Sequence, residues 1–329
     1  MKKLLYIAGF ILLFFSNLRG QGTDPQFTQF YSVPLYLGPS FAGATQEQRF
    51  SGNYRNQWSK INAGQTYVTY AAAYDYYFAK YNSGFGLMFM RDLAGSGSLG
   101  TTMMSLLYSY DLLLFNTWHV RPGISFVYSK YSIDPSKLVL PTQTGPEGTN
   151  PGSEVILPST APPNIDGSVS GLVYNERIWV GLTVDHLLRP NVSFYGDKIL
   201  TPLKYTIYGG AKIISKGRLL KPVDESMSIA YQLKFQGMYK QLDLGLYWYN
   251  SPIVLGLWYR GIPIINSPRG DAIAAVAGFK KNNFSFGYSY DFTISDLKGS
   301  TNGTHEISLI YEFHTVKKRK YHAIPCPEF

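Results

Sequence analysis

The sequence is poor in cysteine, in charge and in long apolar runs. Cys326 is the single cysteine of the 329 residues, so an intramolecular disulfide and a cysteine-based zinc site are both excluded. Charged residues make up 16% of the chain, below the roughly 25% that is usual for soluble domains. Beyond residue 20, no apolar run approaches the length of a membrane-spanning helix. These absences argue against an ordinary soluble domain and against a helical membrane protein.

The first twenty residues are predicted to be a secretory signal peptide. Lys2 and Lys3 precede an apolar core, residues 4–15, that is too short to cross a bilayer comfortably. Residues 16–22 supply small and polar residues, and cleavage is expected near residues 20–21. A membrane anchor helix is the alternative, but the short core argues against it.

Alternation of apolar and polar residues runs through the rest of the chain. In residues 283–297, Phe284, Phe286 and Tyr288 fall on one face, and small or polar residues fall between them. Successive side chains of a strand point to opposite faces, so this strand has one apolar and one polar face. A soluble sandwich would show the same alternation. Its repetition along the chain, together with 27 Tyr, 20 Phe and 5 Trp, favours a transmembrane β-barrel.

About fourteen strands are predicted, and an even number is typical of bacterial outer-membrane barrels. The predicted strands are 49–59, 66–79, 83–91, 100–113, 116–130, 164–174, 176–188, 202–215, 225–239, 240–250, 252–261, 269–280, 283–296 and 303–315. Even-numbered connections should be short periplasmic turns, and odd-numbered connections longer outer loops. Two connections are exceptions, because 215–225 is long for a turn and 239–240 is short for an outer loop. The predicted fold is all-β, an antiparallel barrel in the bacterial outer membrane.

The chain is expected to form one folded domain with shorter segments on either side. The predicted parts are a signal peptide (1–20), an N-terminal plug segment (21–48), the barrel (49–316) and a basic tail (317–329). Residues 23–43 do not fit a strand, because Pro25, Pro34 and Pro39 interrupt any ladder. They are too aromatic for a disordered tail. We therefore expect this segment to plug or line the periplasmic half of the lumen.

Several motifs resemble the PorP/SprF family of type IX secretion system outer-membrane proteins. They are TDPQFTQFYSVPLYLGPSFAGA (23–44), YRNQW (54–58), YSYDFTISDL (288–297), HEISLIYEF (305–313) and CPEF (326–329). The residues of the N-terminal family motif are Asp24, Pro25, Gln26, Phe27, Gln29, Tyr31, Pro34, Pro39, Phe41 and Gly43. Those of the first-strand motif are Tyr54, Arg55, Gln57 and Trp58.

The resemblance implies a non-enzymatic outer-membrane component of type IX secretion or gliding motility. Such a component binds or anchors a secreted surface protein through its C-terminal sorting domain, or works with the periplasmic secretion ring. Expected partners are outer-membrane lipid, the cargo's C-terminal domain on the outer side, and periplasmic ring components or lipoproteins. No nucleic acid is expected, because aromatic girdles explain the tyrosines better. The alternative function is a transport pore for small or apolar solutes.

The sequence shows no pattern typical of an active site, a cofactor site or a metal site. The five histidines are scattered, at His119, His186, His305, His314 and His322. Adjacent residues of a strand point to opposite faces, so His305 and Glu306 should not cooperate. Nothing indicates that His119 and Asp111 are close. We expect no catalytic residue, no cofactor and no metal ion.

Charged residues within the strands are expected to face the lumen, because a charge at lipid depth costs up to about 2–4 kcal/mol. Lys234 and Asp185 are predicted to do so. Strand parity also predicts a basic patch on the periplasmic side, formed by Lys216, Arg218, Lys221, Lys280, Lys281, Lys317, Lys318, Arg319 and Lys320. Docking of an acidic periplasmic partner and contact with anionic lipid both fit such a patch.

Two further expectations concern the first strand and the longest loop. Arg55 carries several hydrogen-bond donors and needs acceptors in a partly buried place. Carbonyl groups of the N-terminal segment, or Asp24, are the candidates. The loop 131–163 is rich in proline and is expected to carry cargo specificity, since binding residues concentrate on loops held by a rigid scaffold.

Overall fold

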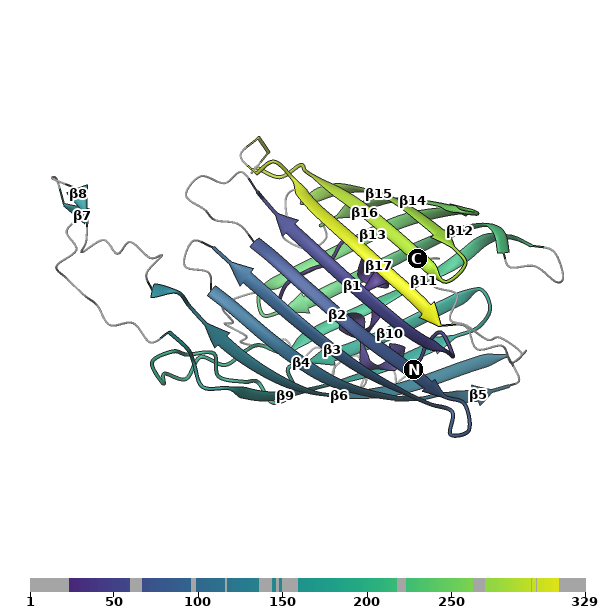
Figure 1. Cartoon of the computed structure of the whole chain (residues 1–329), viewed down its shortest axis with the longest axis horizontal. Helices are drawn as coiled ribbons and strands as arrows, with labels where there is room; N and C mark the ends of the chain where they lie inside the picture. The colour runs from purple at the N-terminus through teal and green to yellow at the C-terminus, as the bar shows by residue number, and fades with distance from the viewer. Residues whose placement is uncertain are drawn as a thin grey trace, which may run out of the picture.

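Antiparallel strands form a closed ring in the computed structural model of the chain (Figure 1). The structure describes residues 24–59, 67–95, 99–115, 117–135, 144–145, 148–149, 159–217, 223–262, 270–296, 298–299 and 301–313. The strands of the ring are β1 (Gln48–Gln57), β2 (Tyr67–Phe78), β3 (Ser83–Ala94), β4 (Leu99–Tyr110), β5 (Leu112–Leu114), β6 (Trp118–Ser132), β9 (Asn164–Tyr174), β10 (Ile178–Asp185), β11 (Lys204–Gly217), β12 (Val223–Gln236), β13 (Tyr239–Asn250), β14 (Ile253–Arg260), β15 (Ala272–Lys281), β16 (Phe284–Thr293) and β17 (Thr304–Phe313). Two short strands, β7 (Thr144–Gly145) and β8 (Gly148–Thr149), form a separate hairpin.

The ring closes because its first and last strands pair. β1 pairs with β2 on one side and with β17 on the other. β4 pairs with β6, and β5 continues β4 after an interruption at Asp111. With β5 counted as part of β4, the barrel has fourteen strands. The predicted barrel is confirmed, and each strand begins and ends within a few residues of its predicted bounds.

The inner and outer faces of the wall differ as the alternation predicted. In β16, Phe284 and Phe286 are exposed on the outside, whereas Ser285 and Ser289 are buried. In β12, Ile229 is exposed and Lys234 is buried inside the barrel. The inner wall therefore carries polar and charged side chains beside a cluster of buried apolar ones, and the outer wall is apolar enough to face lipid.

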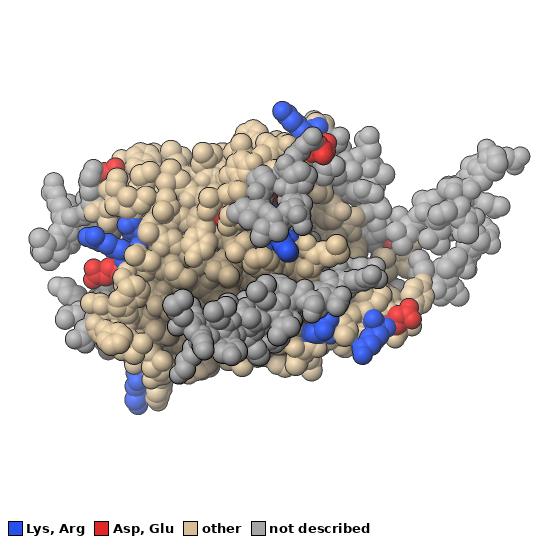
Figure 2. Space-filling model, turned by 180° about the vertical axis from the view of Figure 1, so that it is seen from behind, with Lys and Arg blue, Asp and Glu red and all other residues tan. Residues whose placement is uncertain are grey.

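Aromatic side chains lie on the outer wall towards both of its rims. Tyr54 packs on Tyr70 near one rim, and Phe85 packs on Tyr108 near the other. Figure 2 shows a broad belt with few Lys, Arg, Asp or Glu side chains between two ends where such side chains gather. Aromatic girdles around an apolar belt are typical of outer-membrane barrels. Among the described residues, no helix is long and apolar enough to span a membrane.

The two ends of the barrel differ in the length of their connections. At one end, here called the turn end, strands are joined by residues 79–82, 175–177, 251–252 and 282–283. At the other, the loop end, the connections include 133–163 and 186–203. Outer-membrane barrels have short periplasmic turns and longer outer loops, so the loop end corresponds to the outer face. Residues 237–238 make the short exception that the sequence predicted there.

Residues 24–47, here called the N-terminal segment, run through the lumen from the loop end to the turn end. In Figure 1 the segment lies inside the ring of strands, and it enters β1 at the turn end. It contains η1 (Phe30–Ser32), α2 (Pro34–Leu37) and η2 (Pro39–Phe41). Pro34 and Pro39 are the first residues of their helical turns. Proline is tolerated there, because the N–H of a first helical residue has no partner within the helix.

The first residues of this segment do not lie where the sequence analysis expected them. The expectation was the periplasmic half of the lumen, but Asp24 contacts Lys204 and Gln236 at the loop end. Only the later residues reach the turn end, where Ala42 accepts a hydrogen bond from Ser109. The charged side chain of Asp24 finds its cationic partners at the loop end, and this explains the longer path.

Candidate functional site

The interface between the N-terminal segment and the inner wall is the candidate functional site. At its loop end, the Asp24 carboxylate accepts hydrogen bonds from His186 Nε2 (2.9 Å), Lys204 Nζ (3.0 Å) and Gln236 Nε2 (3.1 Å). His186 Nδ1 bonds to Asp166 at 2.6 Å. Three parts of the wall, namely the end of β10, the start of β11 and the end of β12, therefore converge on one side chain.

These contacts fix the protonation of Asp24 and His186. Burial raises the pKa of Asp24, but the charges of His186 and Lys204 outweigh burial and hold this pKa well below its usual range. Burial lowers the pKa of His186, but Asp24 and Asp166 outweigh it and raise this pKa to about 10. At neutral pH the two residues therefore form a charged pair.

A second ionic network surrounds Thr28. The Glu306 carboxylate accepts hydrogen bonds from the backbone N–H groups of Thr28 (2.8 Å) and Gln29 (2.9 Å). Arg55 donates to Glu306 (2.8 Å) and to Asp291 (3.0 Å). Arg55 and Glu306 are cross-strand partners in β1 and β17, so the network lies at the seam where the barrel closes.

Arg260 joins this network from β14. Its Nη1 donates to Asp291 at 2.6 Å, and its Nη2 donates to Gln26 at 2.8 Å. The side chains of Arg55, Asp291 and Glu306 are at most 3% exposed. Removing one partner of a buried ion pair leaves an uncompensated charge, which costs about 3–5 kcal/mol. The barrel seam and the N-terminal segment therefore depend on the same charges.

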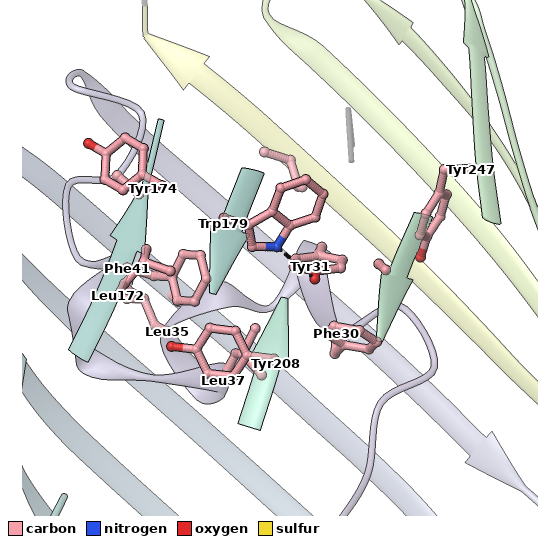
Figure 3. Close-up of a cluster of buried hydrophobic side chains, with 14 of the residues drawn as sticks. Phe30, Tyr31, Leu35, Leu37, Phe41, Leu172, Tyr174, Trp179, Tyr208 and Tyr247 are labelled. Atoms are coloured by element: carbon pink, nitrogen blue, oxygen red, sulfur yellow. Dashed lines mark hydrogen bonds between the residues drawn. The ribbon is translucent and has the colours of Figure 1, made fainter. Parts of the chain in front are cut away.

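The middle of the segment packs through aromatic side chains (Figure 3). Phe30 meets Trp258 edge-on, with ring centroids 4.9 Å apart. Trp179 Nε1 donates a hydrogen bond to the Tyr31 hydroxyl at 3.0 Å. The wall makes room for these rings with glycine, since a Cβ at Gly245 would lie 2.1 Å from Trp258. Each buried aromatic side chain contributes about 1.5–3 kcal/mol.

At the turn end the wall holds the backbone of the segment. Arg121 donates from Nε to the Ser40 carbonyl (3.1 Å) and from Nη2 to the Ala42 carbonyl (2.5 Å). The Gly43 N–H donates to Asp75 at 2.9 Å, and Gly43 has a φ of +65°. A Cβ at Gly84 would lie 1.9 Å from the Ala42 carbonyl oxygen. The segment therefore approaches the wall as closely as glycine permits.

The structure separates the residues of the first-strand motif. Arg55 points into the lumen, but its acceptors are Thr28 Oγ1, Glu306 and Asp291 instead of Asp24 or a backbone carbonyl. Tyr54 lies on the outer wall, and Trp58 packs on Tyr67 with ring centroids 5.6 Å apart. Gln57 ends β1. Of these four residues, Arg55 is the one that bonds to the N-terminal segment.

The residues of the N-terminal family motif all belong to the segment in the lumen. Buried among them are Phe27, Gln29, Tyr31, Pro34, Pro39, Phe41 and Gly43, whereas Asp24, Pro25 and Gln26 are partly exposed near the loop end. Gln29 donates from Nε2 to Ser289 Oγ (3.2 Å) and accepts from Ser308 Oγ (2.6 Å). The motif therefore matches the inner wall of this barrel.

Part of the predicted basic patch lies outside the described residues. Lys216 near the end of β11 and Lys280 and Lys281 at the end of β15 are at the turn end. Arg218, Lys221 and residues 317–320 are not described. Of the loop predicted to carry cargo specificity, residues 136–143, 146–147 and 150–158 are likewise not described.

Most wall residues that bind the N-terminal segment were not predicted from the sequence. Asp291, Glu306, Arg260, Arg121, Lys204 and His186 were not among the predicted site residues. Most are charged residues at inward positions of strands. A charged residue at such a position is the one feature of the sequence that could have indicated a contact with the segment. Nothing in the sequence indicated that His119 and Asp111 are close, yet His119 Nδ1 lies 2.9 Å from Asp111. Pairing of β5 with β6 brings them together.

The described residues contain no group of three or more His, Cys, Asp or Glu side chains that could hold a metal ion. The buried charges instead pair with one another or with the N-terminal segment. Their arrangement serves to hold a polypeptide segment inside a barrel.

The closed ring of strands, the apolar outer wall and the charged side chains that face inward define an outer-membrane β-barrel. The chain belongs to the PorP/SprF family of type IX secretion system membrane proteins, whose family model matches residues 20–311. The family is one of secretion-system membrane proteins, and the barrel fold is found in other outer-membrane proteins. No curated protein matches the sequence.

Solved structures with a similar fold are outer-membrane proteins of low sequence identity. The Ralstonia pickettii toluene transporter TbuX has a TM-score of 0.51 and 11% identity, over 91% of this chain and 100% of that chain. The Acinetobacter baumannii outer membrane protein Omp33 has a TM-score of 0.43 and 8% identity, over 82% of this chain and 98% of that chain. At such identity, the likeness to TbuX supports the fold alone.

Proposed function

We propose that the protein is a non-enzymatic component of type IX secretion or gliding motility that binds or anchors a secreted surface protein. The cargo's C-terminal sorting domain is the proposed contact, at the loop end. The observation that carries the proposal is the lumen, which the protein's own N-terminal segment occupies from one end to the other. A barrel filled in this way is a rigid scaffold for its loops, and binding residues concentrate on such loops.

The proposed contact on the opposite side is with periplasmic ring components or lipoproteins. The basic residues at the turn end favour an acidic partner, because electrostatic complementarity accelerates association. No nucleic acid, cofactor or metal ion takes part in the proposed function. Two regions remain the proposed contacts on the two sides. On the outer side it is the loop 131–163, and on the periplasmic side it is the predicted basic patch of Lys216, Arg218, Lys221, Lys280, Lys281 and residues 317–320.

The alternative is a transport pore for small or apolar solutes, and it requires the N-terminal segment to leave the lumen. Single-channel recording from the purified barrel in a planar bilayer distinguishes the two functions. An anchor with a filled lumen conducts no ions at any holding potential. Stable open-channel currents in the wild-type protein would favour the pore.

Affinity purification from native membranes tests the anchoring function directly. We expect a secreted surface protein to co-elute, and expect it to be lost when its C-terminal sorting domain is deleted. Replacing residues 131–163 with the same loop of a paralog should transfer the cargo preference. Retention of the original cargo would move recognition away from this loop.

A further inference from the structure

The wall of the barrel builds a receptor for one carboxylate at the loop end. His186, Lys204 and Gln236 belong to the barrel, and each donates to the same carboxylate. The carboxylate itself comes from Asp24, which belongs to the N-terminal segment. The receptor is therefore part of the scaffold, whereas its occupant is a side chain of a segment that has no regular structure before η1.

A small cavity adjoins this carboxylate. Lys204, Lys234, Thr206 and Tyr239 line it from the wall, and Phe27 lines it from the segment. Its volume of about 30 Å3 is enough for about two water molecules. Thr206 is 2% exposed, and its hydroxyl has no hydrogen-bond partner among the described residues. A buried hydroxyl without a partner costs about 1–3 kcal/mol, so the cavity offers an unused polar contact to a ligand.

Solvent reaches this site from the loop end. The side chain of Asp24 is 22% exposed, and those of His186 and Lys204 are each 11% exposed. By contrast, the buried carboxylate of Glu306 is fully enclosed. A ligand can therefore approach Asp24 without unfolding the barrel.

The charges at this site favour exchange of a carboxylate over addition of one. The cations Lys204, His186 and Lys234 are paired with the carboxylates Asp24, Asp166, Asp185 and Asp243. One more carboxylate would increase the negative excess. Replacing Asp24 by another carboxylate leaves the balance unchanged.

We propose that Asp24 is a displaceable occupant of a carboxylate-binding site, and that the α-carboxylate of a polypeptide presented from the outer face takes its place on Lys204 and His186. The site is only partly open to solvent. An α-carboxylate at a chain end brings chain on one side only, whereas a side-chain carboxylate in a folded loop brings chain on both sides, so the site favours a chain end. The choice of a polypeptide rests on the proposed function. The carboxylate site itself rests only on the geometry.

Chemical rescue of Asp24→Ala tests the carboxylate site. The probe is sodium acetate, compared with sodium chloride at equal ionic strength, and the readout is thermal unfolding of the purified full-length barrel. We expect the variant to melt below the wild type and acetate, but not chloride, to restore most of the difference. Asp75→Ala removes an enclosed carboxylate at the turn end and is the matched control, with no acetate-specific recovery. Equal effects of both salts on Asp24→Ala overturn the site.

A short fluorescent alanine peptide tests the polypeptide ligand. With a free C-terminus it should bind Asp24→Ala about tenfold tighter than the wild type, which corresponds to about 1.4 kcal/mol. Amidation of the peptide, or Lys204→Gln in the same background, should abolish binding. If acetate restores the variant but the peptide does not bind, the polypeptide ligand is overturned and the carboxylate site stands.

A separate measurement covers the case in which Asp24→Ala does not fold. The peptide is then titrated into the wild-type barrel, and binding that is lost on amidation and in Lys204→Gln supports the proposal. Absence of such binding overturns it. Cargo co-purification is measured independently, so failure of the anchoring function is distinguishable from failure of this site.

Discussion

The two ends of the N-terminal segment are held in different ways. At the loop end the wall contacts mainly side chains, above all the Asp24 carboxylate, together with the Asp24 backbone N–H, which donates to Gln236. At the turn end it contacts backbone, through the Ser40 and Ala42 carbonyls and close packing on Gly84. A side-chain contact can be replaced by another group of the same charge, whereas a backbone contact fixes the path of the chain. The turn end therefore acts as an anchor, and the loop end as a replaceable contact.

The largest effect is expected from Gly84→Val at the turn end. Its Cβ would overlap the Ala42 carbonyl oxygen, 1.9 Å away. Overpacking costs about 1–3 kcal/mol where side chains can adjust, and more where they cannot. Here the obstructing atom is backbone, so the cost should exceed that range and displace the segment. We expect the segment to leave its site, so that the barrel melts at lower temperature and conducts ions. Gly171→Val is the control, because a Cβ there meets nothing within 4 Å. A non-conducting Gly84→Val barrel of normal stability would contradict the anchor.

Arg55→Ala should have the next largest effect. It leaves Glu306 and part of Asp291 uncompensated, which costs about 3–5 kcal/mol. Heat-induced unfolding in detergent measures the loss, and Arg91→Ala, an exposed residue of β3, should show none. The double variant Arg55→Ala, Glu306→Gln should recover part of the loss, since the two residues act as a pair. Additive losses would show that the ion pair does not support the seam.

A pH effect of intermediate size should be confined to the loop end. The pKa of His186 is raised from 6.5 to about 10, so its stabilising contribution is complete below pH 6.5, declines above it and is lost above about pH 10. Thermal unfolding between about pH 7 and about pH 11 should therefore show falling stability. The His186→Gln variant has no imidazole to titrate, so its unfolding temperature should not show this part of the fall with pH. Identical pH profiles for the two proteins would assign the fall to other groups.

The smallest effects on stability are expected from removing one hydroxyl group at each end of the segment. Thr206→Val removes a buried hydroxyl without a partner among the described residues, so stability should stay the same or rise by up to about 1 kcal/mol. Ser109→Ala removes a hydroxyl that donates to the Ala42 carbonyl and accepts from Arg121. It should cost about 1–3 kcal/mol. Similar unfolding temperatures for the two variants would show that the hydroxyl at the turn end contributes no more to stability than the one at the loop end.

The strands were predictable from sequence because their signal is local. Alternation with a period of two is set within each segment by the need for an apolar side towards lipid. The same alternation predicted that Lys234 faces the lumen. It did not predict that Lys234 pairs with Asp243 at 3.1 Å. The partners of the segment were not predictable, because Thr28 and Glu306 are 278 residues apart in the chain.

The sequence by itself determined an outer-membrane barrel of fourteen strands and a family, since residue alternation and local motifs are readable without contacts. Only the tertiary structure decided the path of the N-terminal segment through the lumen. That path depends on which inward charges meet when β1 pairs with β17. It also depends on where glycine lets two backbones touch. Both conditions arise only after the ring has closed, because closure brings the two ends of the chain together.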